Sequence, residues 1–349
     1  TKGRTVPLFY PFGGAVTGGS LPSTSLANQA LDWEKTTQYN MGIDFTLFKR
    51  KLSGVIDLYT SKTKDLLMAR NLPTVTGFLT TIENVGETAN RGVDLSLITT
   101  NIDTKHFNWT TNFTASWQKD RIVTLSNGKQ DDINNNWFIG QPIGVIYGFA
   151  SNGMWQYSDT ALLRKFALNG NNFTAGNVRP IDQNGDNKID ANNDRTIIGH
   201  TRPRWIVGMT NSLTYKNFEF SIFVYGRLNY WANTGGEAQT ARGNQRQINY
   251  WTENNQNSEY QKPIYSVGSG DPYSPSLGYK KASFLKIRNI SAAYNLPSKA
   301  LKALHMSSLR LYFQAANPGM LFSKISFLDM DVNSNISNRG FTFGINAGF

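Results

Sequence analysis

Apolar and polar residues alternate with a period of two through much of this chain, and this pattern constrains its fold more than any other feature. The first such segment places apolar side chains at Tyr39, Met41, Ile43, Phe45 and Leu47. Successive side chains of a β-strand point to opposite faces, so each such segment predicts a strand with one apolar and one polar face. Helical periodicity is nearly absent. The sequence therefore predicts an all-β chain.

The alternation recurs in about nine segments, most of them roughly 10–15 residues long. The predicted strands centre on residues 39–47, 52–67, 93–97, 109–117, 205–215, 218–228, 284–294, 309–315 and 341–349, with an irregularity near Arg288 and a helical piece at 299–304. A strand that crosses a membrane at a tilt needs about 9–11 residues, whereas ordinary globular strands have about 5–6. These lengths favour a transmembrane antiparallel β-barrel.

The connections between the predicted strands alternate between short turns and long segments. The long segments are roughly residues 68–90, 127–201, 229–281 and 316–338. Outer-membrane barrels have short periplasmic turns and long extracellular loops. We therefore expect residues 1–35 to form an extracellular loop and residues 36–349 to form strands and loops. Bacterial barrels close with an even number of strands, so about nine strands predict further strands from a preceding segment.

The two faces of these strands predict two different environments. Unpaired backbone groups cost several kcal/mol each in lipid, so a sheet survives there only when it closes on itself. The apolar face would then contact outer-membrane lipid, and the polar face would line a wet lumen. Aromatic girdles at the lipid head groups are predicted from residues near strand ends, namely Trp109, Trp117, Trp205, Tyr215, Tyr225 and Tyr294.

Composition excludes several other classes of protein. The chain has 349 residues and no Cys, which excludes disulfides and thiol chemistry. No apolar run approaches the roughly 20 residues of a spanning helix, and no signal-peptide pattern opens the sequence, so we expect a mature or truncated chain. The net charge of +11 is spread along the chain, which argues against nucleic-acid binding. His106, His200 and His305 are far apart in the predicted topology, and no catalytic motif appears, so no enzyme is predicted.

Four segments, taken in order, carry a resemblance to a known family. They are LDWEKTTQYN at 31–40, LSGVIDLY at 52–59, NVGETANRGVD at 84–94 and SFLKIRNISAAYNLP at 283–297. Together they resemble the SusC/RagA family of TonB-dependent outer-membrane transporters, and the similarity runs from about residue 30 to residue 349. The resemblance implies the C-terminal part of a barrel of about 22 strands. The N-terminal plug and about thirteen strands would lie outside this chain.

The resemblance also implies a function and partners. A large nutrient, either a glycan or an oligopeptide, would be imported across the outer membrane of a Gram-negative, Bacteroidetes-like bacterium. A SusD-like lipoprotein would cover the extracellular mouth, and the TonB complex would act through the plug. Two alternatives stay open. One is a structural or secretion-associated barrel that docks partner proteins without importing nutrient, and the other is a soluble β-rich carbohydrate-binding protein.

An acidic segment in the second long connection resembles a calcium-binding loop. Asp182, Asn184, Asp186 and Asp190 occupy positions 1, 3, 5 and 9 of such a loop, the carbonyl of Lys188 occupies position 7, and Asp194 follows. Position 6 is Asn rather than Gly, and position 12 is Asn rather than Glu. The alternative is a turn rich in Asp and Asn. Bound Ca²⁺ would stiffen the loop and perform no chemistry.

Two further groups of residues are candidate sites. Aromatic residues of the long connections are candidates for stacking on sugar rings or contacting a lid protein: Trp137, Trp155, Trp231, Tyr250 and Trp251. Packing within the loops is the alternative for each of them. The final strand, with Phe341, Phe343, Ile345 and the terminal Phe349, resembles the signal that the barrel-assembly machinery recognises, and the alternative is simply a last strand.

Overall fold

The computed structural model describes residues 6–12, 15–21, 25–234, 248–263, 270–332 and 338–349, and most of them are in strands. Two compact units make up the chain. The first is Thr1–Ile43, Ile56–Val93 and Gln118–Ile143, and the second is Asp44–Val55, Asp94–Trp117 and Gly144–Phe349. Among the described residues, no helix is long and apolar enough to cross a membrane.

Nine strands of the ten-stranded main sheet follow one another in space, which confirms the predicted number, and the tenth, β3, pairs with β6 off this path. The order of the nine among the described strands is β18–β17–β16–β13–β12–β7–β6–β5–β4. Every neighbouring pair from β7 to β18 is antiparallel. The bounds are β4 (Lys35–Leu47), β5 (Leu52–Asn71), β6 (Thr80–Asp103), β7 (Phe107–Thr124), β12 (Trp205–Tyr215), β13 (Phe218–Leu228), β16 (Phe284–Asn295), β17 (Ser308–Ser323) and β18 (Gly340–Gly348).

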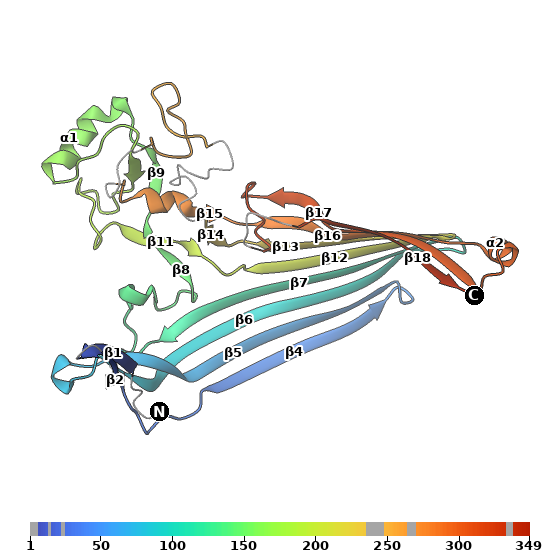
Figure 1. The fold of residues 1–349 in the computed structure, drawn as a ribbon, viewed down its shortest axis with the longest axis horizontal. Helices are drawn as coiled ribbons and strands as arrows, with labels where there is room; N and C mark the ends of the chain where they lie inside the picture. Colours follow the sequence, from blue (N-terminus) through green and yellow to red (C-terminus); the bar gives the residue numbers. More distant parts are fainter. Residues whose placement is uncertain (1–5, 13–14, 22–24, 235–247, 264–269, 333–337) are drawn as a thin grey trace. The chain divides into compact units, whose positions relative to one another are not determined.

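Several predicted details of this sheet are confirmed. β12 and β13 have the predicted bounds and are joined by a two-residue turn in which Lys216 is left-handed. The irregularity expected near Arg288 is present, because the register of β16 shifts between Ile287 and Asn289. The helical piece is α2 (Ser298–Ala303). In Figure 1, α2 lies at one end of β16 and β17, and the folded connections of the same unit lie at the other end.

The predicted lengths of the connections were wrong in two places. β6 has 24 residues, so most of the expected loop 68–90 belongs to strands, and only a short connection with η1 (Thr74–Thr76) is left. β17 likewise continues to Ser323. The β6 extension is rich in polar side chains, which interrupt the apolar alternation but leave the backbone free to pair, whereas the β17 extension is masked by the turn-like residues Asn317, Pro318 and Gly319. Sequence periodicity therefore underestimates a strand that continues beyond its apolar part.

The connection 127–201 has about the predicted length, but it is folded rather than simply a loop. It contains η2 (Ile133–Asn135), β8 (Val145–Phe149), β9 (Ser151–Met154), η3 (Tyr157–Asp159), α1 (Thr160–Leu168), β10 (Val178–Pro180) and β11 (Arg195–His200). Three elements lie between β13 and β16, namely β14 (Trp231–Asn233), η5 (Ser274–Gly278) and β15 (Tyr279–Lys281). β8 pairs with β11, β9 with β10, and β14 with β15.

The first 35 residues contain structure that the sequence analysis did not anticipate. β1 (Val6–Phe12) and β2 (Ala15–Leu21) form an antiparallel hairpin that is separate from the main sheet. β3 (Ser25–Leu26) pairs parallel to the start of β6. Only from Lys35 does the chain enter the nine-strand order.

The strand register separates apolar and polar side chains onto two faces of the sheet. One row of laterally paired residues across β18, β17, β16, β13, β12 and β7 consists of Phe343, Phe313, Ala292, Phe220, Leu213 and Trp109. The next row, on the opposite face, consists of Thr342, Gln314, Ser291, Ser221, Ser212 and Thr110. Phe343 is 78% exposed. We call these the apolar face and the polar face.

Aromatic residues gather near both ends of the apolar face. Phe107, Tyr215, Phe218 and Tyr294 form a lateral row beside the short turns. Trp117 pairs with Trp205 where β12 begins, with ring centroids 6.5 Å apart. Tyr225 was wrongly predicted to belong to a girdle. It pairs with Gly208 on the polar face, and the guanidinium of Arg288 lies 4.4 Å from its ring centroid, because the β16 irregularity brings that cation beneath it.

A matched pair of substitutions tests the assignment of the two faces. Met209 lies on the apolar face in the middle of β12, and Thr210 lies on the polar face. Arginine facing the middle of a bilayer costs about 2–4 kcal/mol. We expect Met209→Arg to reduce the free energy of unfolding by about that amount and Thr210→Arg to reduce it far less, because its guanidinium stays in water. Denaturant titration of the full-length protein in lipid vesicles measures both, and equal losses would contradict the assignment.

Candidate functional site

The folded connections of the second unit are held together by small aromatic clusters. α1 places Phe166 against Trp155, with ring centroids 5.5 Å apart, and Phe173 stacks on Trp155 while also contacting Phe166. The turn before α1 is fixed by a reciprocal capping box between Gln156 and Asp159. Ile189, from the acidic loop, completes the cluster. These contacts give the connection a core of its own.

Two of the five candidate ligand-contacting aromatics are buried in these clusters, which corrects their predicted role. Trp155 is 1% exposed and Trp251 is 4% exposed. The indole Nε1 of Trp251 donates a hydrogen bond to Oε1 of Gln156 at 2.9 Å. Neither ring presents a face to a ligand or to a lid protein. Both rings pack within the loops, which was the alternative interpretation of these residues. Aromatic residues in a polar connection can form its core as readily as its binding surface, and sequence alone does not separate the two.

The other three candidate aromatics differ in exposure. Tyr250 is 45% exposed, whereas Trp137 and Trp231 are partly buried. Trp231 packs over Gly199, where its indole occupies the space that a Cβ atom would need. Contact of these three residues with a ligand or a lid stays a prediction.

The acidic loop is ordered by hydrogen bonds from its own backbone. The carboxylate of Asp182 accepts from the amides of Gly185 at 2.7 Å and Asn187 at 2.8 Å. Asp186 accepts from the amide of Lys188 at 2.8 Å. Asn187 is left-handed, with φ of 60°, as Asn tolerates at this position. The sequence therefore folds locally as a series of Asx turns.

Asp194 closes this loop at its base. Its carboxylate is fully buried and accepts from the amides of Gln183 at 2.9 Å and Asp190 at 2.8 Å. The carboxyl of Asp190 accepts from the amides of Asn193 and Asn192, and the bond from Asn193 is the largest cause of its lowered pKa. Ile189 is buried beneath the loop.

Calcium binding by this loop stays a prediction. Among the residues that the structure describes, no group of three His, Cys, Asp or Glu side chains is arranged to hold a metal ion. The oxygens of Asp182, Asp186 and Asp194 instead accept backbone amides.

Calorimetry of the full-length protein tests the calcium hypothesis. The hypothesis predicts that millimolar Ca²⁺ raises the melting temperature and that Asp186→Asn abolishes the increase, because a ligand that binds only the folded state stabilises it. Lys188→Ala, which keeps the backbone carbonyl, is the matched control and should retain the increase. An unchanged melting temperature in Ca²⁺ would remove the hypothesis.

A buried ionic cluster on the polar face was missed by the sequence analysis. Lys286 on β16 is 1% exposed, and its Nζ lies 2.6 Å from Asp329 and 3.5 Å from Asp331. Arg288 donates through Nε to Asp331 at 2.9 Å. Lys286 pairs laterally with Tyr225, which lies on the polar face. The cluster therefore fastens the segment after β17 against the polar face of β16.

Apolar packing surrounds the ionic cluster and explains its burial. Tyr230, Ala282, Phe284, Ile325 and Met330 form the adjacent core. Burial raises the pKa of Tyr230 to about 12. One sequence signal might have located the cluster in advance: Lys286 and Arg288 are two residues apart, and so are Asp329 and Asp331.

Removing the central cation tests how strongly this cluster fixes the segment. Breaking a buried ion pair from one side costs about 3–5 kcal/mol, because the partner charge stays buried. We expect Lys286→Met to destabilise residues 324–332 by about that amount, and the added changes Asp329→Asn and Asp331→Asn to recover part of it. Hydrogen exchange of the segment measures the effect. Lys299→Met on α2, an exposed position, is the control, and an equal effect there would contradict the role of the cluster.

The separated faces of the sheet define the class of protein, a transmembrane antiparallel β-barrel. A family model described as TonB dependent receptor-like, beta-barrel, matches residues 3–317. The chain therefore belongs to the TonB-dependent receptor β-barrel family. This is a family of receptors and transporters rather than of enzymes.

Individual relatives confirm the resemblance to SusC and RagA. TonB-dependent receptor P3 of Formosa agariphila is 30% identical over 319 residues, which cover 84% of this chain and 30% of the receptor. TonB-dependent receptor SusC of Bacteroides thetaiotaomicron is 27% identical over 348 residues, which cover 94% of this chain and 32% of SusC. The chain thus spans about a third of the length of these relatives.

Solved structures show the same fold. A structure of the RagAB peptide importer in its open-open state aligns with a TM-score of 0.75 and 20% sequence identity, over 99% of this chain and 38% of that chain. A second RagAB structure, described as a peptide transporter, aligns with a TM-score of 0.72 and 21% identity.

Proposed function

We propose that this chain forms part of a TonB-dependent transporter that imports a large nutrient across the outer membrane of a Gram-negative bacterium. The observation that carries the proposal is the pair of opposed rows, one entirely apolar and one entirely polar, across six strands. Such a sheet suits a wall between hydrocarbon and a water-filled passage. Membership of the receptor family supports the same function.

The proposed partners follow from the relatives. Further barrel strands and a plug would come from the rest of a longer protein, and the TonB complex would act through that plug. A SusD-like lipoprotein would cover the passage at the end where the folded connections lie. Tyr250, Trp137 and Trp231 are the remaining aromatic candidates for contact with that lid or with the nutrient.

The cargo is proposed as an oligopeptide or a glycan. The solved relatives are described as a peptide importer and a peptide transporter, which supports the oligopeptide. Aromatic side chains in the connections are also suited to stacking on sugar rings, which keeps the glycan as the second candidate. The ionic cluster at Lys286 would shape the passage by holding residues 324–332 on the polar face.

Uptake by the native host tests this function. Deleting the parent gene should abolish uptake of a fluorescently labelled oligopeptide or glycan mixture, and complementation should restore it. Inactivating TonB should abolish it again, because the energy for import comes through that complex. If the protein is assembled in the outer membrane and yet its loss changes no uptake, the alternative of a structural or secretion-associated barrel is favoured instead.

A further inference from the structure

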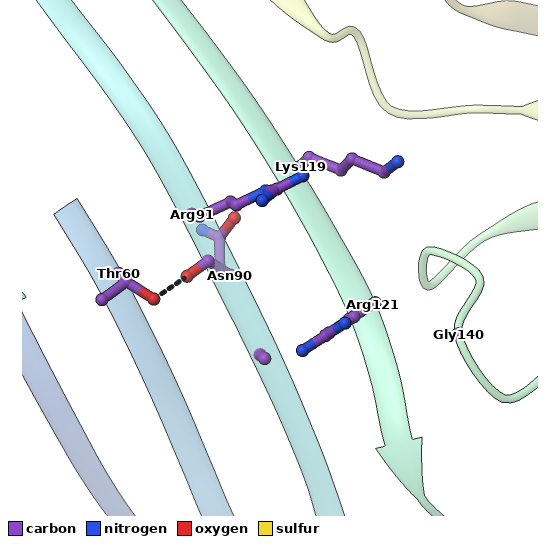
Figure 2. Close-up of a pocket in the computed structure, with 7 residues that line it drawn as sticks. Thr60, Asn90, Arg91, Lys119, Arg121 and Gly140 are labelled. Carbon is purple, nitrogen blue, oxygen red and sulfur yellow. Dashed lines mark hydrogen bonds between the residues drawn. The ribbon is translucent and has the colours of Figure 1, made fainter. Parts of the chain in front are cut away.

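A small basic pocket lies on β6 and β7, away from the polar face. Its volume is about 180 Å³, and its lining includes Thr60, Arg91, Lys119, Arg121 and Gly140. Figure 2 shows the Arg91 side chain extending from β6 towards β7 and the Arg121 side chain extending from β7 towards β6. Thr60 Oγ1 donates to the backbone carbonyl of Asn90 at 3.5 Å. Three cations therefore border one cavity.

None of these three cations is neutralised within the part of the chain that the structure describes. Arg91, Lys119 and Arg121 have no carboxylate within ion-pairing distance among those residues. Glu87, also on β6, is paired with Lys62 at 2.6 Å. Figure 2 shows Arg91 and Arg121 pointing toward one another, whereas Lys119 extends away from β6, and like charges that face one cavity repel unless an anion lies between them. The pocket thus has the electrostatics of an anion-binding site.

Strand alternation places this pocket on the apolar face. Lys119 and Arg121 follow Trp117 by two and four residues along β7, so they share its face. The Cβ position of Gly54 is occupied by Phe45 and Leu97, which marks that face on β5 and β6. Thr60 is six residues after Gly54 on β5, and Arg91 is six residues before Leu97 on β6. An even spacing along a strand puts both side chains on the same face as these two residues. Gly92, on the opposite face, packs against Tyr59, which confirms the phase of the alternation.

The far wall of the pocket is fixed by hydrogen bonds to β7. The amide of Gly140 donates to the carbonyl of Ile122 at 2.8 Å. The carbonyl of the next residue, Gln141, accepts from the amide of Ile122 at 2.9 Å. The amide of Ile143 donates to Asp120 at 2.9 Å. Asp120 alternates with Lys119 and Arg121, so its carboxylate serves the connection rather than the cations. The backbone of the connection therefore holds one wall of the pocket in place, while Arg91, Lys119 and Arg121 are exposed side chains that border it.

Along β7, the cations of the pocket lie within and just beyond the thickness of a lipid head-group layer above Trp117. At about 3.3 Å per residue, Lys119 and Arg121 lie about 7 and 13 Å along β7 beyond Trp117. For a strand tilted by about 45°, these become about 5 and 9 Å along the membrane normal. The head-group layer on each side of a bilayer is roughly 5–7 Å thick. Long connections mark this end as extracellular.

We propose that this pocket binds a phosphate of a lipid head group in the outer leaflet, such as the phosphorylated glucosamine of lipopolysaccharide. The proposal rests on the membrane location proposed above. Arginine pairs with phosphate through two parallel hydrogen bonds, and two arginines approach the cavity from opposite strands. A soluble phosphate would meet the same cations, but a pocket on the apolar face faces lipid rather than the passage.

Native mass spectrometry of the full-length protein with added lipid A tests this site. The variant Arg91→Gln, Lys119→Gln, Arg121→Gln should bind lipid A more weakly by on the order of 100-fold, since each cation near anionic lipid contributes roughly fivefold. Dephosphorylated lipid A should bind the wild type and the variant equally weakly. The control removes three cations from the turn at the other end of β5, by Lys49→Gln, Arg50→Gln and Lys51→Gln, and should bind lipid A as the wild type does.

Other outcomes would overturn the proposal. Equal binding of lipid A by the wild type and the pocket variant would show that the three cations do not hold the lipid. Complete displacement of lipid A by millimolar inorganic phosphate would assign the pocket to a soluble anion. Uptake of labelled nutrient, measured in the same variants, keeps the two proposals separate: intact uptake with no lipid binding contradicts the pocket alone, and a protein absent from the outer membrane contradicts the proposed function.

Discussion

The backbone hydrogen bonds of the main sheet are the constraint on which the rest of the structure depends. Hydrocarbon offers no partner for an amide or a carbonyl, so every such group in a membrane wall must pair with a neighbouring strand. The register from β7 to β18 provides that pairing except at the shifts of β16 against its neighbours, one against β13 and two against β17. Once pairing fixes the strands side by side, alternation along each one sorts side chains between lipid and water.

Folded connections then add structure that the sheet alone would lack. Aromatic clusters around Trp155 and Trp251 pack two of the long connections against each other, and the buried pairs of Lys286 fasten the segment after β17 against the polar face. Buried ion pairs contribute little net stability against apolar replacements, but they discriminate strongly among arrangements, because a misplaced partner leaves a charge buried. The cluster at Lys286 thus specifies where the segment after β17 lies.

The sequence predicted the parts of the fold that local rules determine. The bounds of β12 and β13, the irregularity near Arg288 and the helix α2 all follow from alternation, turn residues and local propensity. It failed where a strand outlasts its apolar part, as in β6, and where a polar connection forms a core, as around Trp155. The ionic cluster and the basic pocket join residues from different strands, so only the register between those strands brings them together.

Accessibility of single labels along β12 tests the central claim most directly. The chain has no Cys, so a single Cys introduced at one position from 207 to 213 in each variant gives this chain one attachment point for a nitroxide label. With the full-length protein in lipid vesicles, the account predicts that labels at Val207, Met209 and Leu213 collide with oxygen dissolved in the lipid, whereas those at Gly208, Thr210 and Ser212 collide with a water-soluble nickel reagent. A series of labels with no alternation, or with the two sets exchanged, would contradict it.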